Sequence, residues 1–204
     1  MWKHKMLMKL IGPKKTERIL TRYNAWIHAV SERYGVPASA IKAILYQEMT
    51  IINLMDVAAD LVVQTNLFRK KDSSTGYAQI FGYVGVNALN FAVDRKLATY
   101  DSVGIACTHR LDPHNPKDVR LMWKKLRSNP KINIEIATMN LLAAADEVVG
   151  RTDFHTFSAD ELKLVLTRYN ANTRHITPYG ERAFAKYEEY EEASKQRKME
   201  KSDV

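Results

Sequence analysis

The chain of 204 residues is 46% apolar, which suffices for one domain with a sizeable core. No apolar run approaches the roughly 18 residues that span a bilayer, and lysines and Gly12-Pro13 interrupt the N-terminal segment, so we expect no secretory signal. A single cysteine, Cys107, excludes an intramolecular disulfide framework. The 31 basic and 23 acidic residues give a net charge of +8, which favours anionic partners. Because the basic residues are spread along the chain, with small clusters at 69–71 and 124–125, we expect a solvated surface rather than a dedicated polyanion site.

Helical periodicity dominates the first part of the chain. Apolar residues recur at helical spacing over 16–34, which predicts a core-facing helix with Thr16 as its cap. Gly35 and Pro37 then stop this helix, and the pattern over 38–49 predicts the next one.

The following stretch predicts one more helix and then a change of structure. Residues 53–66 form the predicted helix, where Asp56 and Asp60 lie one turn apart and are expected to be solvated. The turn formers and glycines of 68–85 predict a loop or a short β-hairpin, and the helical pattern resumes over 84–95.

Residues 100–117 have no periodicity and contain two X-Pro breaks, which predicts an irregular surface segment. Four side chains of metal-ligand type occur there at a spacing that matches no usual zinc module: Cys107, His109, Asp112 and His114. We therefore expect no metal and no cofactor.

Three more helices are predicted, at 117–128, 131–149 and 159–171. The second is apolar around much of its circumference, which predicts a central helix closed by Gly150. Ser158 and Glu161 form a capping box before the third. The predicted organisation is an N-terminal extension at 1–15, one domain at 16–190, and a charged, fraying tail at 191–204.

Three segments that carry chemistry occur in a fixed order. Glu48 ends a helix after YGVPASAIKAILYQ, STGYAQIF follows at 74–81, and RYNANTRHITPYGERAFAKY spans 168–187, with NPKINIEIATMNLL between the last two. In this order they resemble the soluble lytic transglycosylase (SLT) and goose-type lysozyme superfamily, over about residues 30–190. The resemblance implies a mainly α, lysozyme-like helical domain, with its cleft between a larger helical lobe and the 68–85 segment.

The resemblance also implies roles for single residues. Glu48 matches the catalytic acid of the family. The other matches are Gly76, Tyr77, Ala78 and Gln79 on its G-L-M-Q turn, Asn133 and Ile134 on its N-I pair, and Tyr169, Asn170 and Ala171 on its Y-N-A. The resemblance thus implies substrate binding by Gly76, Tyr77, Gln79, Tyr169 and Asn170, with Gln79 orienting the acid or an acetamido group. The chain departs from the pattern at Met49, at Tyr77-Ala78 and at Asn172, where Ser, Leu-Met and Gly are usual.

The family chemistry explains the need for an acid. Cleavage of the β-1,4 bond between N-acetylmuramic acid and N-acetylglucosamine requires a proton on the departing oxygen. A carboxyl in apolar surroundings keeps its proton near neutral pH, and Glu48 has Leu45, Met49 and Ile51 as neighbours in the sequence. In a lytic transglycosylase, the same carboxylate then takes the proton of the muramic C6 hydroxyl, which attacks C1 and gives a 1,6-anhydro product.

Other functions remain as alternatives. A goose-type muramidase needs a base that activates water, with the two carboxyls about 6.5–9.5 Å apart, and Asp72 is the candidate, ahead of Asp56 and Asp60. A basic helical module that binds nucleic acid or an acidic partner belongs to another class, and a wall-binding protein without activity is a third. A buried Glu48 would favour the enzyme, a contiguous basic patch the binding module, and a blocked cleft the inactive protein.

The setting follows from the resemblance. Peptidoglycan lies outside the cytoplasmic membrane, so an enzyme without a secretory signal would reach it after lysis, by holin-type release, or through a dedicated secretion machine. An endolysin or an injected effector fits these routes. We expect glycan strands as the substrate, an immunity or inhibitor protein in the effector setting, no nucleic acid, no membrane span and a monomer.

Overall fold

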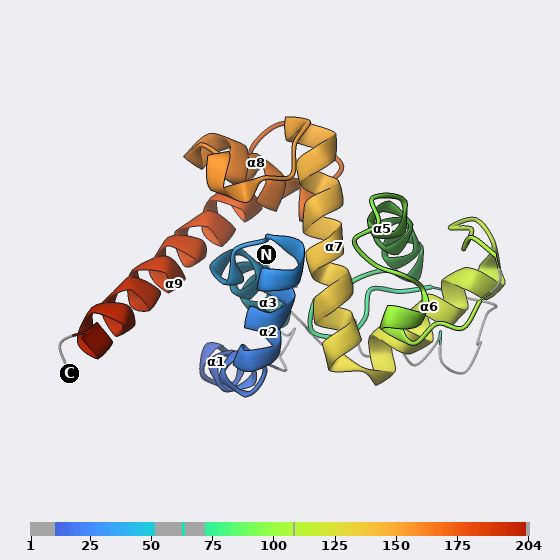
Figure 1. Ribbon diagram of the computed structural model, residues 1–204, viewed down its shortest axis with the longest axis horizontal. Coiled ribbons are helices and arrows are strands. Elements are labelled where there is room, and N and C mark those ends of the chain that lie inside the picture. Colours follow the sequence, from blue (N-terminus) through green and yellow to red (C-terminus); the bar gives the residue numbers. More distant parts are fainter. Residues whose placement is uncertain (1–10, 52–62, 64–71, 108, 203–204) are drawn as a thin grey trace, which may run out of the picture.

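The protein is mainly helical. The computed structural model describes residues 11–51, 63, 72–107 and 109–202 (Figure 1). Its helices are α1 (Pro13–Arg22), α2 (Asn24–Tyr34), α3 (Ala38–Ile51), α5 (Gly82–Asp94), α6 (Pro116–Ser128), α7 (Pro130–Val149), α8 (Ala159–Asn170) and α9 (Pro178–Ser202), with 3-10 turns at Asp101–Val103 and Phe154–Thr156. The predicted mainly α class is confirmed. The helix predicted at 53–66, with Asp56 and Asp60, lies outside the described residues.

The prediction of one helix over 16–34 is wrong, because the chain breaks at Tyr23 into α1 and α2. The ring of Tyr23 packs against Tyr77 with centroids 5.9 Å apart, so a tertiary contact lies at the break. Thr16 is not the cap either: it is buried inside α1, which begins at Pro13 after Gly12. Proline suits this first position because its φ is already helical and its missing N–H has no partner to lose.

The helices predicted at 38–49, 84–95, 117–128, 131–149 and 159–171 are confirmed to within a few residues, and their ends follow the local chemistry. Gly35 ends α2 and Gly150 ends α7 in left-handed conformations, at φ 69° and 79°. Ser158 and Glu161 form the predicted capping box of α8. At the C-terminus, 191–202 is helical rather than frayed, and Ser39 Oγ donates a hydrogen bond to the Glu191 carboxylate.

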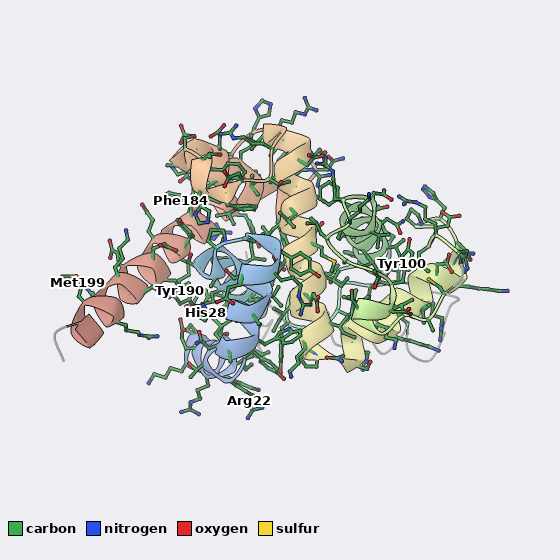
Figure 2. All side chains as sticks on the ribbon, viewed as in Figure 1. Arg22, His28, Tyr100, Phe184, Tyr190 and Met199 are labelled. Atoms are coloured by element: carbon green, nitrogen blue, oxygen red, sulfur yellow. The ribbon has the colours of Figure 1, made fainter. Side chains whose placement is uncertain are left out.

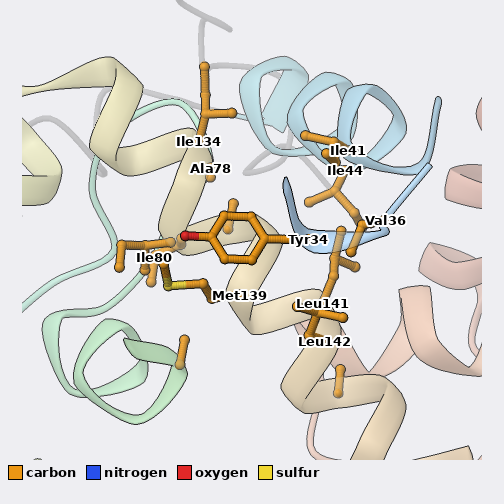
Figure 3. Packing of buried hydrophobic residues seen from close by; sticks show 14 of the residues in the cluster. Tyr34, Val36, Ile41, Ile44, Ala78, Ile80, Ile134, Met139, Leu141 and Leu142 are labelled. Carbon is orange, nitrogen blue, oxygen red and sulfur yellow. The ribbon is translucent and has the colours of Figure 1, made fainter. Parts of the chain in front are cut away.

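The long helix α7 is the centre of the molecule, as its apolar circumference predicted (Figure 1). It packs against α2 and α3 on one side, α5 and α6 on the other, and α8 near its C-terminal end, while α9 packs on α3 and α8. Figure 3 shows the core around it, where Ile41 and Ile44 of α3 and Met139 and Leu142 of α7 are almost completely buried. The end of α3, the 74–81 segment and the start of α5 approach one another beside α7, where they line one hollow.

The helices in the described part of the chain were also compared with the length and hydropathy of a membrane span. None of them is both long and apolar enough to cross a bilayer.

Candidate functional site

A buried carboxylate lies near the end of α3. Glu48 is only 4% exposed, yet it lines a cleft. Tyr179 Oη donates a hydrogen bond to Glu48 Oε1 at 2.5 Å. Because burying a carboxyl without a partner is costly, this bond helps to explain how Glu48 is tolerated inside the fold.

Two tyrosines surround this carboxylate and stay protonated. Burial, and then the negative charge of Glu48, raise the pKa of both Tyr169 and Tyr179 well above the ordinary value. Tyr179 also donates the hydrogen bond to Glu48, while Tyr169 Oη donates to the carbonyl of Ala78 at 2.9 Å. The hydroxyl of Tyr179 therefore acts as a fixed donor toward the acid, and Tyr169 ties α8 to the turn at 74–81.

The 74–81 turn is held in shape by α7. Thr75 and Ile80 form an isolated antiparallel bridge, so the predicted hairpin is reduced to this single pair within the described residues. Asn133 Oδ1 accepts the N–H of Ala78 at 2.8 Å, and its Nδ2 donates to the Thr75 carbonyl at 3.2 Å. Gly76 has φ 73°, and a Cβ there would lie 2.3 Å from Asn133 Nδ2. Glycine is required at this position by the backbone and by the close approach of Asn133.

Gln79 has an uncommon backbone conformation and forms hydrogen bonds within the turn. Its φ is 46°, an uncommon backbone conformation for a residue with a side chain. Its Nε2 donates to the Gly76 carbonyl at 2.8 Å, and its Oε1 accepts from Ser74 Oγ at 3.2 Å. These bonds are those of a turn amide, and Gln79 also lines the cleft.

The cleft has a volume of about 850 Å³ and runs between α3, α5, α7, α8 and the 74–81 turn. This size is within the range of small-molecule sites. Besides Glu48 and Gln79, its walls include Phe81, Tyr83, Asn140, Tyr169, Asn170 and Asn172. An open cleft with one buried acid, several amides and exposed aromatic rings can bind a polar ligand that has apolar faces.

A second hollow continues the cleft toward α6. It has a volume of about 480 Å³ and shares Tyr83 and Asn87 with the first. Tyr83 is 47% exposed and its ring lies 5.8 Å from that of Phe81, between centroids. The two rings form an aromatic shelf at the junction of the two hollows.

Asp72 lies in the second hollow and does not line the cleft that holds Glu48. Its two carboxylate oxygens accept the N–H groups of Gly82 at 2.6 Å and Tyr83 at 3.1 Å. These are the first residues of α5, whose N-cap Phe81 makes no side-chain cap bond. Asp72 thus caps α5 from a distance in the chain, where a negative charge also interacts well with the helix dipole.

Two other acids that line the cleft lie at the end of α7, and each is paired with an arginine outside this helix. Asp146 lies 2.6 Å from an Nη of Arg95, and Glu147 lies 2.7 Å from an Nη of Arg168. Both acids are partly exposed, at 31% and 47% of the side chain. Glu48 therefore differs from them in its burial and in its neutral tyrosine partner.

The structure brings together part of the residue set that the sequence predicted. Glu48, Gln79, Tyr169 and Asn170 line one cleft. Gly76 and Tyr77 are not among its lining residues: Gly76 lies against Asn133, and the ring of Tyr77 packs on Tyr23. Met49, one of the departures from the family pattern, is fully buried, whereas Asn172, another, lines the cleft.

Sequence reasoning did not single out Tyr179, the direct partner of Glu48. The two residues lie 131 positions apart, so no periodicity connects them. The only local signal is that Tyr179 follows Pro178 in the first turn of α9, directly after the segment that carries Tyr169 and Asn170.

The irregular segment at 100–117 is explained by local pairing. His109 Nε2 lies 3.4 Å from both carboxylate oxygens of Asp118, and the N–H of His114 bonds to Asp112 Oδ1 at 2.8 Å. Among the residues that the structure describes, no three histidine, cysteine or acidic side chains come together as metal ligands would.

Comparison with known proteins gives no relative to set beside this geometry. No family model, no curated protein and no solved structure matches the chain.

Proposed function

We propose that the protein is a peptidoglycan-cleaving glycosidase with a lysozyme-like helical domain, acting on the bond between N-acetylmuramic acid and N-acetylglucosamine. The observation that carries the proposal is the buried Glu48 carboxylate, which lines an open cleft and accepts a hydrogen bond from Tyr179. A buried carboxyl favours its protonated form, which is the form that a general acid needs. The open cleft also argues against an inactive protein with a blocked site.

The cleft offers suitable contacts for a glycan strand. The exposed rings of Phe81 and Tyr83 can stack on the apolar faces of sugar rings, and the amides of Asn140, Asn170 and Asn172 can bond to hydroxyl and acetamido groups. Gln79 and Tyr169 line the same cleft, and Tyr169 holds the 74–81 turn through its bond to the Ala78 carbonyl. This mixture of aromatic faces and amides favours a neutral, amide-bearing saccharide over a nucleotide.

In the proposed reaction, Glu48 donates its proton to the glycosidic oxygen as the bond to C1 of the muramic residue breaks. The resulting carboxylate then takes the proton of the C6 hydroxyl, whose oxygen bonds to C1. The products are a 1,6-anhydromuramic end and a free N-acetylglucosamine 4-hydroxyl, so Glu48 regains its proton without any water. Tyr179 is a positioning residue that holds the carboxylate in both steps.

Hydrolysis through Asp72 is the second candidate. The geometry favours it less, because both oxygens of Asp72 accept N–H groups of α5 and the side chain faces the second hollow. A carboxylate in that position stabilises a helix and is a weak base. We therefore propose lytic transglycosylase chemistry, with glycan strands as substrate and release by lysis, holin or a secretion machine as the route.

Digestion of purified peptidoglycan tests this proposal. Wild-type protein and Glu48→Gln are incubated with sacculi, and the soluble muropeptides are identified by mass spectrometry. We expect 1,6-anhydro ends from the wild type and a loss of at least about 100-fold in rate for the variant. Reducing ends in place of anhydro ends would establish a muramidase. If the folded wild type releases nothing from walls of several compositions, or if Glu48→Gln releases as much, the proposal is refuted.

A further inference from the structure

The surface of α6 is unusually basic. Residues 116–128 hold five basic side chains and one acidic one, so this short helix supplies a net +4 of the chain's +8. The acid, Asp118, is only 6% exposed and accepts the N–H of Asp112 at 2.9 Å. The side chains that we call the basic face are Lys117, Arg120, Lys124, Lys125 and Arg127.

The charges of the basic face are close to one another. Lys117, Arg120, Lys124 and Arg127 recur every three or four residues, so they lie on successive turns of one side of the helix, about 5.4 Å apart along its axis. Of the salt bridges within the described ranges, none involves Lys117, Lys124 or Lys125. Figure 2 shows nitrogen-tipped side chains projecting into solvent around α6, on the side of the molecule away from α9. Such a row of like charges complements a polyanion.

The apolar side chains of α6 indicate which kinds of polyanion the basic face can bind. Of the large apolar residues of this helix, Val119, Met122, Trp123 and Leu126 are buried, and Leu121 is partly buried against the core. The face therefore presents no aromatic ring on which bases could stack, as proteins that bind single-stranded nucleic acid do. It also presents no row of apolar side chains that could enter a bilayer, as interfacial helices do. What remains is attraction to negative charge, which a chain of phosphodiesters supplies at regular intervals.

The basic face begins where the substrate cleft ends. Pro116 and Val119 of α6 line the second hollow, which joins the Glu48 cleft through Tyr83 and Asn87. Lys117 and Arg120 are the next residues along the helix. A polymer attached to the glycan strand beside the bound sugars would meet this face first.

We propose that the basic face of α6 binds the phosphodiester-linked polyol polymer that bacterial walls carry on their glycan strands, and so holds the enzyme on its insoluble substrate. This inference rests on the proposed function for its setting. It accounts for the position of the charge, next to the cleft, which a solvated surface alone leaves unexplained.

Co-sedimentation with sacculi tests the inference. All proteins carry Glu48→Gln, so that the walls stay intact, and the probes are sacculi with their glycerol-phosphate polymer and the same sacculi stripped of it. The test variant is K117Q/R120Q/K124Q. The control is K14Q/K15Q/R18Q, which removes the same charge from exposed positions of α1. We expect the α6 variant to bind polymer-bearing walls about tenfold more weakly or worse, and the slope of log affinity against log salt to fall by about 2. The control should bind like the Glu48→Gln parent.

Several results would overturn the inference. These are equal binding to both kinds of sacculi, an equal loss in the α1 control, or no loss in the α6 variant. Tighter binding to single-stranded DNA or to vesicles of anionic phospholipid than to the polymer would also overturn it, because the partner would then be of another class. Muropeptide release from stripped sacculi by the wild type is measured separately, so failure of the proposed function is distinguished from failure of polymer binding.

Discussion

At the scale of single residues, the pairing of Glu48 with Tyr179 joins an acid to a donor that stays neutral. Burial and the charge of Glu48 both raise the pKa of Tyr179, so its O–H remains a donor over the whole range in which such an enzyme would work. A hydrogen bond to the charged form of an acid stabilises that form. The tyrosine therefore makes the second step, in which Glu48 is a carboxylate, easier to reach.

Replacing Tyr179 by Phe removes this donor and leaves the charged form of Glu48 less stable. We expect a lower kcat and an alkaline limb of the pH profile that moves up by about one pH unit, since a hydrogen bond to a charged group contributes about 1.5–3 kcal/mol. The measurement is the initial rate of muropeptide release between pH 4 and 9. Tyr187→Phe is the matched control, because it removes a hydroxyl from the same helix at a half-buried position outside the cleft. An unchanged pH profile in Tyr179→Phe would contradict the positioning role.

For Asp72 we expect a substitution to lower the stability of the fold and to leave the rate of the reaction nearly unchanged. Asp72→Asn keeps one acceptor for the N–H groups of α5 but loses the charge near the helix terminus. We expect a loss of about 0.5–1 kcal/mol in the free energy of unfolding and an anhydro product that still forms at a rate within a few-fold of the wild type. Chemical denaturation and product analysis measure these two effects. A rate that falls as far as that of Glu48→Gln would identify Asp72 as a base after all.

At the scale of elements, the 74–81 turn depends on one side chain of α7. Asn133 is fully buried and satisfies the N–H of Ala78 and the carbonyl of Thr75. The two residues of the turn with positive φ are Gly76 and Gln79. Each directly follows one of the two residues to which Asn133 bonds. The turn is therefore shaped by a helix that lies more than fifty residues further along the chain.

Asn133→Ala tests this dependence. The change leaves the buried N–H of Ala78 without a partner, whereas the Thr75 carbonyl keeps its bond from the Ile80 N–H. An unsatisfied buried group costs about 1–3 kcal/mol, so we expect the free energy of unfolding to fall by about that amount. Urea denaturation measures it. The exposed Asn87, replaced by Ala, is the control and should change stability by less than about 0.5 kcal/mol. Near-equal stability of the two variants would show that the turn holds its shape without Asn133.

The same elements show how far the sequence predicts the structure. Helices with local signals, such as Ser158 and Glu161 before α8, were predicted correctly because their ends are decided within a few residues. The break at Tyr23 was not predicted, because it coincides with a contact to Tyr77 that periodicity cannot reveal. In the site, the sequence pointed to Glu48 but not to Tyr179, since their pairing exists only after α9 packs against α3.

At the scale of the whole molecule, buried tyrosines link folding to alkaline pH. Burial raises the pKa of both Tyr34 and Tyr179, and each donates to a buried glutamate, Glu135 and Glu48 respectively. Since the folded-state pKa lies above the unfolded value of about 10, their stabilising effect is complete below pH 10 and is lost as the pH rises further. The fold should therefore weaken on the alkaline side.

We expect the free energy of unfolding to fall above pH 10 by about 1.4 kcal/mol per pH unit for each such tyrosine. Denaturation at pH 8, 9, 10 and 11 measures this slope. Tyr34→Phe and Tyr179→Phe should each reduce this slope by about 1.4 kcal/mol per pH unit. Replacement of the exposed Tyr83 by Phe should leave the slope unchanged. A stability that is constant from pH 9 to 11 would contradict the prediction.

The position of Tyr179 at the start of the last helix has a consequence for synthesis. The Glu48 carboxylate is made early, but its partner emerges only with α9, and that helix then docks along α3 through contacts that extend to Glu191. A nascent or prematurely terminated chain thus carries the acid without the group that orients it. If the proposed activity is present, a cell that makes this protein would be exposed to it only after α9 has left the ribosome.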